Sequence, residues 1–168
     1  MSDVVREHHS TSPQQLRCAV ITVSDTRTLE NDTGGETIIS LLKSAGHEIV
    51  ERVIVPDDPL RLRPILEQLR DRAVDAILVT GGTGIAQRDK TYETIQALIT
   101  KGLPGYGELF RMLSYAEIGA AAMLSRAIGG LLERTVILSM PGSPAGVRLA
   151  MEKLVLPELA HLVREARR

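Results

Sequence analysis

The chain has 168 residues, 20 basic and 21 acidic side chains and only four aromatic residues, so neither a basic stripe nor base-stacking side chains favour nucleic-acid binding. Its single cysteine, Cys18, excludes an internal disulfide and a cysteine-based metal site. No apolar stretch approaches the length of a membrane span and no hydrophobic signal core is visible, which predicts a cytoplasmic protein without a membrane partner.

The N-terminal residues 1–15 are polar and predict a flexible tail, and residues 16–168 predict a single domain. Short apolar runs in this domain predict strands, each bounded by turn-forming residues. A weaker run at residues 131–132 predicts a loop or an edge. The clear strands are expected at residues 18–23, 49–55, 76–79 and 136–140.

Helical patterns alternate with these runs. Pro64 fits poorly inside the second pattern, so that helix either starts near Pro64 or is kinked there. Gly119 predicts a break in the fourth pattern, and Pro157 predicts a bend in the last. The expected helices are residues 33–45 ending at Gly46, 58–72, 91–100, 106–128 as one or two helices, and a final helix from Ser143-Pro144.

Continuous apolar strands that alternate with helices predict a three-layer α/β/α sandwich with a mostly parallel sheet. In such sheets ligands bind beyond the carboxyl ends of the strands. The segments that follow the strands should therefore share one rim of the molecule. They are residues 24–25, 56–58, 80–89 and 141–144.

The segment Val-Thr-Gly-Gly-Thr-Gly-Ile-Ala-Gln-Arg-Asp at residues 79–89 is the most informative of these. Glycines at 81, 82 and 84 allow a sharp bend and a close approach of backbone N–H groups to an anion such as phosphate. Neither a Walker loop nor the dinucleotide-binding fingerprint is present. A plain glycine-rich turn is the competing interpretation.

Two carboxylates on the predicted rim, Asp57 and Asp89, could hold Mg²⁺ beside a phosphate. Asp58 is explained by capping the following helix. The sequence Pro-Gly-Ser-Pro at residues 141–144 is explained by a turn and a helix start, and such a start also presents N–H groups to an anion. The simple alternative for Glu108 is a surface ion pair with Arg111, and for Ser24-Asp25 a turn.

The chain resembles a known family, the molybdopterin-binding proteins of molybdenum cofactor biosynthesis. This family includes protein B of that pathway and the molybdopterin adenylyltransferases. The resemblance runs from about residue 17 to the last helix. It departs from the common pattern at Tyr92, where many relatives have proline, and at Met140, where leucine is common. The matching motifs are Thr-Gly-Gly-Thr-Gly at 80–84, Arg-Asp at 88–89 with Thr91, Gly-x-Gly-Glu-Leu-Phe-Arg at 105–111, Leu-Ser-Arg-Ala at 124–127, Pro-Gly-Ser-Pro at 141–144, Ser-Asp at 24–25, Asp-Thr-Gly at 32–34 and Pro-Asp at 56–57.

The resemblance implies a three-layer α/β protein that forms a trimer or a hexamer of two trimers. It implies binding of molybdopterin and transfer of AMP from ATP, with Mg²⁺, to the terminal phosphate of the pterin, which releases pyrophosphate. It also implies contacts with other enzymes of the pathway. Asp57 and Asp89 take the two catalytic and metal-binding positions. The implied substrate- and phosphate-binding positions are Ser24, Asp25, Thr80, Gly81, Gly82, Thr83, Gly84, Glu108, Ser125, Pro141, Gly142 and Ser143.

Two other functions compete with adenylyl transfer. Some members of the family bind the pterin without adenylylating it, so a non-catalytic binding or scaffold protein is the alternative. A nucleotide-processing enzyme like the competence-associated domain shares a similar glycine-rich loop, but the Gly-Glu-Leu-Phe-Arg segment at residues 107–111 and the short chain disfavour it.

Overall fold

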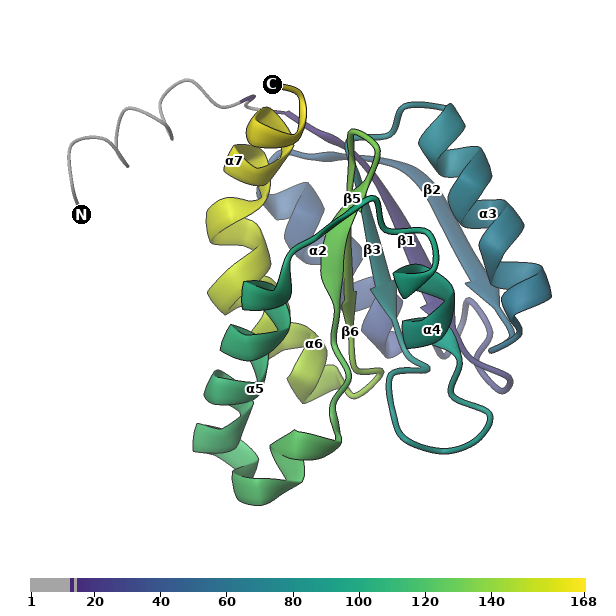
Figure 1. Ribbon diagram of the computed structural model, residues 1–168, viewed down its shortest axis with the longest axis vertical. Coiled ribbons are helices and arrows are strands. Elements are labelled where there is room, and N and C mark those ends of the chain that lie inside the picture. Colours follow the sequence, from purple (N-terminus) through teal and green to yellow (C-terminus); the bar gives the residue numbers. More distant parts are fainter. Residues whose placement is uncertain (1–12, 14) are drawn as a thin grey trace.

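The computed structural model describes residue 13 and residues 15–168 (Figure 1). The flexible tail predicted for residues 1–15 therefore lies almost wholly outside the described residues. Within residues 15–168, no helix combines the length and the apolar character that crossing a membrane requires.

A six-stranded sheet forms the centre of the fold, in the order β2-β1-β3-β6-β5-β4. The first four strands in this order run parallel, whereas β5 is antiparallel to β6 and to β4. The predicted mostly parallel sheet is thus confirmed. The strands are β1 (Arg17–Val23), β2 (Glu48–Val55), β3 (Ala76–Thr80), β4 (Lys101–Gly102), β5 (Gly129–Leu132) and β6 (Thr135–Met140).

Helices cover both faces of this sheet, which confirms the three-layer sandwich. Successive residues of β1 alternate between the two layers: Cys18 and Val20 belong to one buried cluster, and Ala19 and Ile21 to the other. One cluster includes side chains of α2 (Thr33–Ser44), α5 (Pro104–Ile118), α6 (Pro144–Ala150) and α7 (Leu156–Ala166). The opposite cluster includes side chains of α3 (Pro59–Asp71) and α4 (Thr91–Gln96).

The strand predictions were right for the four clear runs and wrong for residues 131–132. These residues belong to β5, which lies between β6 and β4 and is neither a loop nor an edge. Two of the four residues of β5 are glycines, which carry no apolar signal. The edge strand β4 has only two residues and was not predicted. The helix expected at residues 91–100 ends earlier, because the chain turns after Gln96 to enter β4.

The prolines and Gly119 explain the helix boundaries. Asp58 caps α3 by accepting a hydrogen bond from the Leu60 N–H, so α3 starts at Pro59 and continues through Pro64. Gly119 has a φ of +64° and ends α5, and the chain continues as a short 3₁₀ helix, η1 (Gly119–Leu124). Pro157 follows a π-helical turn, η2 (Met151–Val155), where the change of hydrogen-bond register accommodates its missing N–H.

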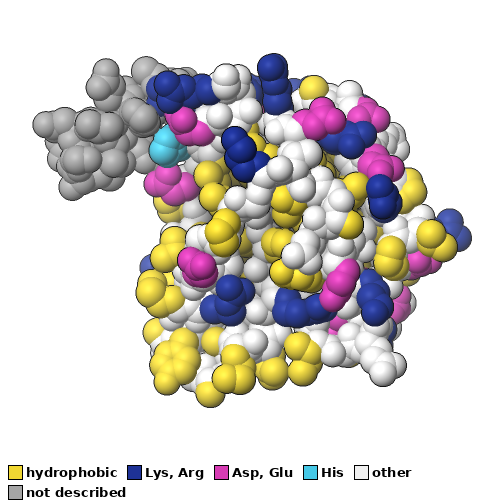
Figure 2. Space-filling view, in the orientation of Figure 1, with side chains coloured by type: hydrophobic (Ala, Val, Ile, Leu, Met, Phe, Trp, Pro, Cys, Tyr) yellow, Lys and Arg dark blue, Asp and Glu magenta, His cyan; other side chains and the backbone are white. Residues whose placement is uncertain are grey.

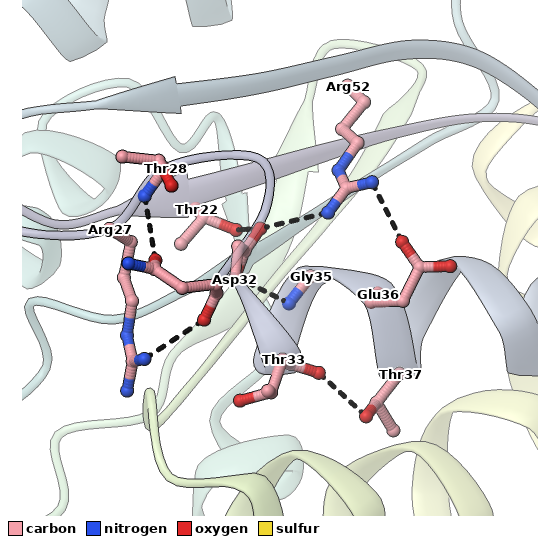
Figure 3. A network of polar contacts seen from close by, with 10 residues as sticks. Thr22, Arg27, Thr28, Asp32, Thr33, Gly35, Glu36, Thr37 and Arg52 are labelled. Carbon is pink, nitrogen blue, oxygen red and sulfur yellow. Dashed lines mark hydrogen bonds and ion pairs between the residues drawn. The ribbon is translucent and has the colours of Figure 1, made fainter.

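A buried carboxylate fixes the start of α2 beside the sheet (Figure 3). Asp32 is 3% exposed, and its Oδ1 accepts from the Gly35 N–H at 2.9 Å while its Oδ2 accepts from the Thr22 hydroxyl at 2.8 Å. Arg52 from β2 lies 3.5 Å from the same Oδ2 and pairs with Glu36 at 2.8 Å. One carboxylate thereby ties together β1, β2 and the first turn of α2.

Candidate functional site

The four segments predicted to share a rim do lie together at the carboxyl ends of the parallel strands. The Ser24 N–H donates to the Val55 carbonyl at 2.8 Å, and the Gly81 N–H donates to the Met140 carbonyl at 3.1 Å. The Thr80 hydroxyl donates to the Pro141 carbonyl at 2.9 Å. These bonds between neighbouring strand ends fix the spacing of the loops on which a ligand would rest.

The turn at residues 81–84 has a backbone that requires glycine. Gly81 and Gly82 have φ values of +98° and +64°. A Cβ on Gly81 would collide with the Val23 carbonyl oxygen, and one on Gly82 would collide with the side chains of Asp57 and Thr91. None of the N–H groups of residues 82–84 donates a hydrogen bond within the described part of the chain. They are therefore available to an anion, as in other glycine-rich anion sites.

A pocket of about 380 Å³ opens between this turn, η1 and the start of α6. Its walls combine polar backbone from the turn with apolar side chains from α5 and η1, a combination typical of small-molecule sites. Among the sequence-predicted residues it includes Gly81, Gly82, Thr83, Gly84, Ser125, Pro141, Gly142 and Ser143. Ser125 Oγ is buried without a hydrogen-bond partner among the described residues.

Asp57 approaches the turn from the end of β2. Its Oδ1 accepts the Lys90 N–H at 3.0 Å, whereas its Oδ2 is buried beside Gly82 and the Thr91 hydroxyl and accepts from no backbone N–H of the described residues. Burial raises the pKa of Asp57 above its usual range, and the negative charges of Asp89 and Asp25 add to this rise, while the hydrogen bonds from the Lys90 N–H and the Thr91 hydroxyl oppose it. A cation would relieve both effects, because it would compensate the buried charge and screen the repulsion.

Asp89 approaches the same turn from its far end. Its Oδ2 accepts the Ala86 N–H at 2.9 Å, and its own N–H donates to the Ala86 carbonyl at 2.9 Å. A Cβ on Gly84 would lie 2.5 Å from that Oδ2, so the carboxylate faces the turn. Asp89 therefore closes its own loop through one oxygen.

The donor set of this rim fits Mg²⁺ bound together with a phosphate. Among the described residues there is no group of three or more His, Cys, Asp or Glu side chains arranged to hold a metal alone. Mg²⁺ commonly uses one or two carboxylates and takes its other ligands from substrate phosphates and water. Asp57 and Asp89 beside free backbone N–H groups match this pattern.

Four other predicted residues do not line this pocket, and the side chains of three of them are engaged in hydrogen bonds elsewhere. Glu108 is exposed and lines a separate cavity of about 340 Å³ with Tyr92 and Arg111, so the structure does not bring it to the glycine turn. Ser24 Oγ accepts from the N–H groups at residues 26 and 27, as the turn interpretation predicts. Asp25 accepts from the Asp57 N–H at 3.3 Å. Thr80 is buried and bonded to Pro141, which makes it a support of the rim.

Arg126 is the residue that sequence reasoning missed. It lies just after η1, and its guanidinium donates to the carbonyl oxygens of Gly84 at 2.7 Å and Asp89 at 2.9 Å. The motif Leu-Ser-Arg-Ala at residues 124–127 contained the signal, but an arginine separated by 37 residues from Asp89 cannot be assigned to a loop from local pattern alone.

Comparisons with known proteins agree with this geometry. The family model described as "Probable molybdopterin binding domain" matches residues 19–161. Molybdenum cofactor biosynthesis protein B of Bacillus subtilis (strain 168) is 53% identical over 166 residues, which is 98% of each chain.

Solved structures give the same result. A crystal structure of a molybdenum cofactor biosynthesis protein B superposes with a TM-score of 0.89 at 49% identity, covering 94% of this chain and 99% of the other. The tungsten cofactor synthesizing protein from Pyrococcus furiosus superposes with a TM-score of 0.84 at 37% identity, covering 94% and 100%. The chain therefore belongs to the molybdopterin-binding domain family, among the molybdenum cofactor biosynthesis proteins B.

Proposed function

We propose that this protein is a molybdopterin adenylyltransferase, which binds molybdopterin and transfers AMP from ATP to its terminal phosphate. The observation that carries the proposal is the Asp57 carboxylate, whose Oδ2 is buried and whose charge is opposed by burial and by Asp89 and Asp25, beside a turn with unpaired N–H groups. A cation bound together with a phosphate would compensate the buried charge and use these N–H groups.

The reaction that fits this site is a displacement at phosphorus. An oxygen of the pterin phosphate bonds to the α-phosphorus of ATP, the bond from that phosphorus to the α–β bridging oxygen breaks, and pyrophosphate leaves. Little covalent help from the protein is needed, so the catalytic contribution is positioning and charge neutralisation. Bound Mg²⁺ would supply positive charge to the phosphate oxygens.

The protein groups have separate roles in this proposal. Asp57 and Asp89 would hold Mg²⁺, and the N–H groups of residues 82–84 would bind phosphate oxygens. The start of α6 borders the same pocket, where Ser143 caps the helix by accepting from the Gly146 N–H at 3.2 Å. The apolar wall from α5 and η1 would exclude water from the ring system.

The test is incubation of the protein with molybdopterin, ATP and Mg²⁺, with adenylylated pterin and pyrophosphate both quantified. We expect the two products in equal amounts, and neither when Mg²⁺ is removed with a chelator. Pterin binding without pyrophosphate release would contradict adenylyl transfer and support the non-catalytic binding function instead.

We further propose that the protein assembles with copies of itself, as a trimer or as two trimers. Apolar side chains gather over α5 and η1 (Figure 2). They are Leu109, Met112, Tyr115, Ile118, Met123 and Leu124, between 47% and 74% exposed. Apolar surface of this kind favours a contact between proteins. Light scattering should give a trimer or hexamer, and Met112→Glu should shift it toward the monomer; a monomeric wild-type protein would contradict the proposal.

A further inference from the structure

The guanidinium of Arg126 holds the segment between Gly84 and Asp89 at both ends. Its Nε donates to the Gly84 carbonyl at 2.7 Å, and its Nη2 donates to the Asp89 carbonyl at 2.9 Å. Residues 85–88 between these two points are exposed. Within this segment, Asp89 itself makes the hydrogen bonds to Ala86. One side chain thus spans the part of the rim that carries a proposed metal ligand.

Arg126 is itself held in place by three further contacts. Its backbone N–H donates to the Thr83 carbonyl at 3.1 Å, which anchors its backbone to the glycine turn. Its Nη1 pairs with Glu93 in α4, and its guanidinium lies 5.3 Å from the centre of the Tyr92 ring. The contacts to Gly84 and Asp89 use main-chain oxygens, so the guanidinium forms no hydrogen bond with the carboxylate of Asp89.

We propose that Arg126 is a positioning residue for Asp89 and for the N–H groups of the glycine turn, and that Glu93 orients it. The proposal rests on the proposed function, in which Asp89 holds Mg²⁺. The planar guanidinium with its fixed donor directions suits this role, because it can bond two carbonyls at once. A lysine could bond only one of them with comparable geometry. Without Arg126, we expect the loop at residues 85–89 to be more mobile and Mg²⁺ to bind more weakly, while the protein stays folded.

The experiment compares Arg126→Ala, Arg126→Lys and Glu93→Gln with the wild-type protein. Arg63→Ala is the matched control, because Arg63 forms an exposed ion pair with Glu67 on α3, away from the glycine turn. Amide hydrogen exchange of residues 85–89 is measured without ligand. The Mg²⁺ concentration for half-maximal AMP transfer, kcat and the melting temperature are measured on the same variants.

We expect Arg126→Ala to speed exchange of the Ala86 and Asp89 amides by about tenfold or more, because their loop opens more often. We expect the half-maximal Mg²⁺ concentration to rise by about tenfold, because a small displacement of Asp89 would weaken Mg²⁺ binding. Millimolar guanidinium should partly restore both readouts. Arg126→Lys and Glu93→Gln should be intermediate, and Arg63→Ala should match the wild-type protein.

Unchanged exchange at residues 85–89 in Arg126→Ala would overturn the proposal. Faster exchange with an unchanged Mg²⁺ dependence would also overturn it, because Arg126 would then order the loop without serving the metal site. If the wild-type protein transfers no AMP, the proposed function fails by itself. The exchange measurement then still decides whether Arg126 holds the loop, and calorimetric titration with Mg²⁺ and ATP replaces the activity readout.

Discussion

Two aspartates near the same end of the sheet, Asp32 and Asp57, have opposite surroundings. Asp32 is almost fully buried, and both of its oxygens accept hydrogen bonds, from Gly35 and Thr22, with Arg52 at 3.5 Å (Figure 3). Asp57 is more exposed, yet one of its oxygens is buried beside the Thr91 hydroxyl with no backbone N–H of the described residues donating to it, and the charges of Asp89 and Asp25 oppose its own. The more buried carboxylate is thus the better satisfied of the two.

This contrast separates a structural carboxylate from one that is available to a ligand. A buried charge that receives several hydrogen bonds and an arginine contributes to the fold, because removing it leaves donors unpaired. A carboxylate with a free oxygen and acidic neighbours weakens the fold slightly and gains from a bound cation. The predictions below test whether stability and activity divide between the two regions in this way.

The largest effect is expected for Asp89→Asn. Asparagine can still accept the Ala86 N–H through its own oxygen, so the loop should remain closed. In the proposed function the substitution removes the negative charge that would hold Mg²⁺, and AMP transfer should slow by about a thousandfold or more, which corresponds to roughly 4 kcal/mol. The measurements are turnover at saturating ATP and pterin, pterin affinity and thermal melting. Near wild-type turnover would remove Asp89 from the mechanism, whereas a collapsed melting temperature would show that it is structural.

Asp57→Asn should lower AMP transfer by about a hundredfold or more for the same reason. The same substitution should raise the free energy of unfolding at neutral pH. Because the pKa of Asp57 is raised in the folded protein, ionisation lowers the free energy of unfolding as pH rises from the usual aspartate range through the raised pKa. The asparagine variant lacks this loss. The gain in free energy of unfolding over the wild-type protein should therefore be larger at neutral pH than at acidic pH. Urea unfolding of both proteins at the two pH values measures it.

Asp32→Ala should destabilise the fold by about 2–4 kcal/mol, because it removes the cap of α2 and leaves Thr22 and the partly buried Arg52 without this partner. Glu36→Gln is the matched control: it breaks the exposed half of the same network and should cost less than about 1 kcal/mol. Urea unfolding measures both. Equal effects of the two substitutions would show that burial of Asp32 does not matter.

The smallest effect is expected for the reaction rate of the Cys18 thiol, which measures how often the sheet opens. It is fully buried in β1, and burial together with the charge of Asp75 raises its pKa to about 12. The native thiol should therefore react very slowly with a thiol reagent. Asp32→Ala should accelerate the reaction, and Asp57→Asn and Asp89→Asn should leave it unchanged. Acceleration by all three substitutions would abolish the distinction between the regions.

The sequence predicted the layers and the rim because these follow from local patterns. Continuous apolar runs identify strands that are buried on both faces, and the direction of parallel strands places their following loops together. The predicted caps at Asp58 and Ser143 were confirmed, since a cap depends only on neighbouring residues.

The parts that sequence reasoning missed depend on contacts between distant segments. Strand β5 is stabilised by pairing with β6 and contains too few apolar residues to be recognised alone. Glu108 lies on α5 and lines a separate cavity, a placement that its motif does not reveal, and its binding role stays a prediction. The contact of Arg126 with Gly84 spans 42 residues, and no local pattern encodes it.

The strand order has a consequence for the order in which the parts of this rim form during synthesis. Strands β2, β1 and β3 are neighbours in the sheet and lie within the first 80 residues, so this half of the sheet can pair early. The remaining parts of the rim come much later: Arg126 lies between η1 and β5, and the segment 141–144 follows β6, the last strand to be made. A nascent chain therefore carries both Asp57 and Asp89 long before it has the residues that hold their loop. The complete rim should form only when the final third of the polypeptide has left the ribosome, as the closing step of folding.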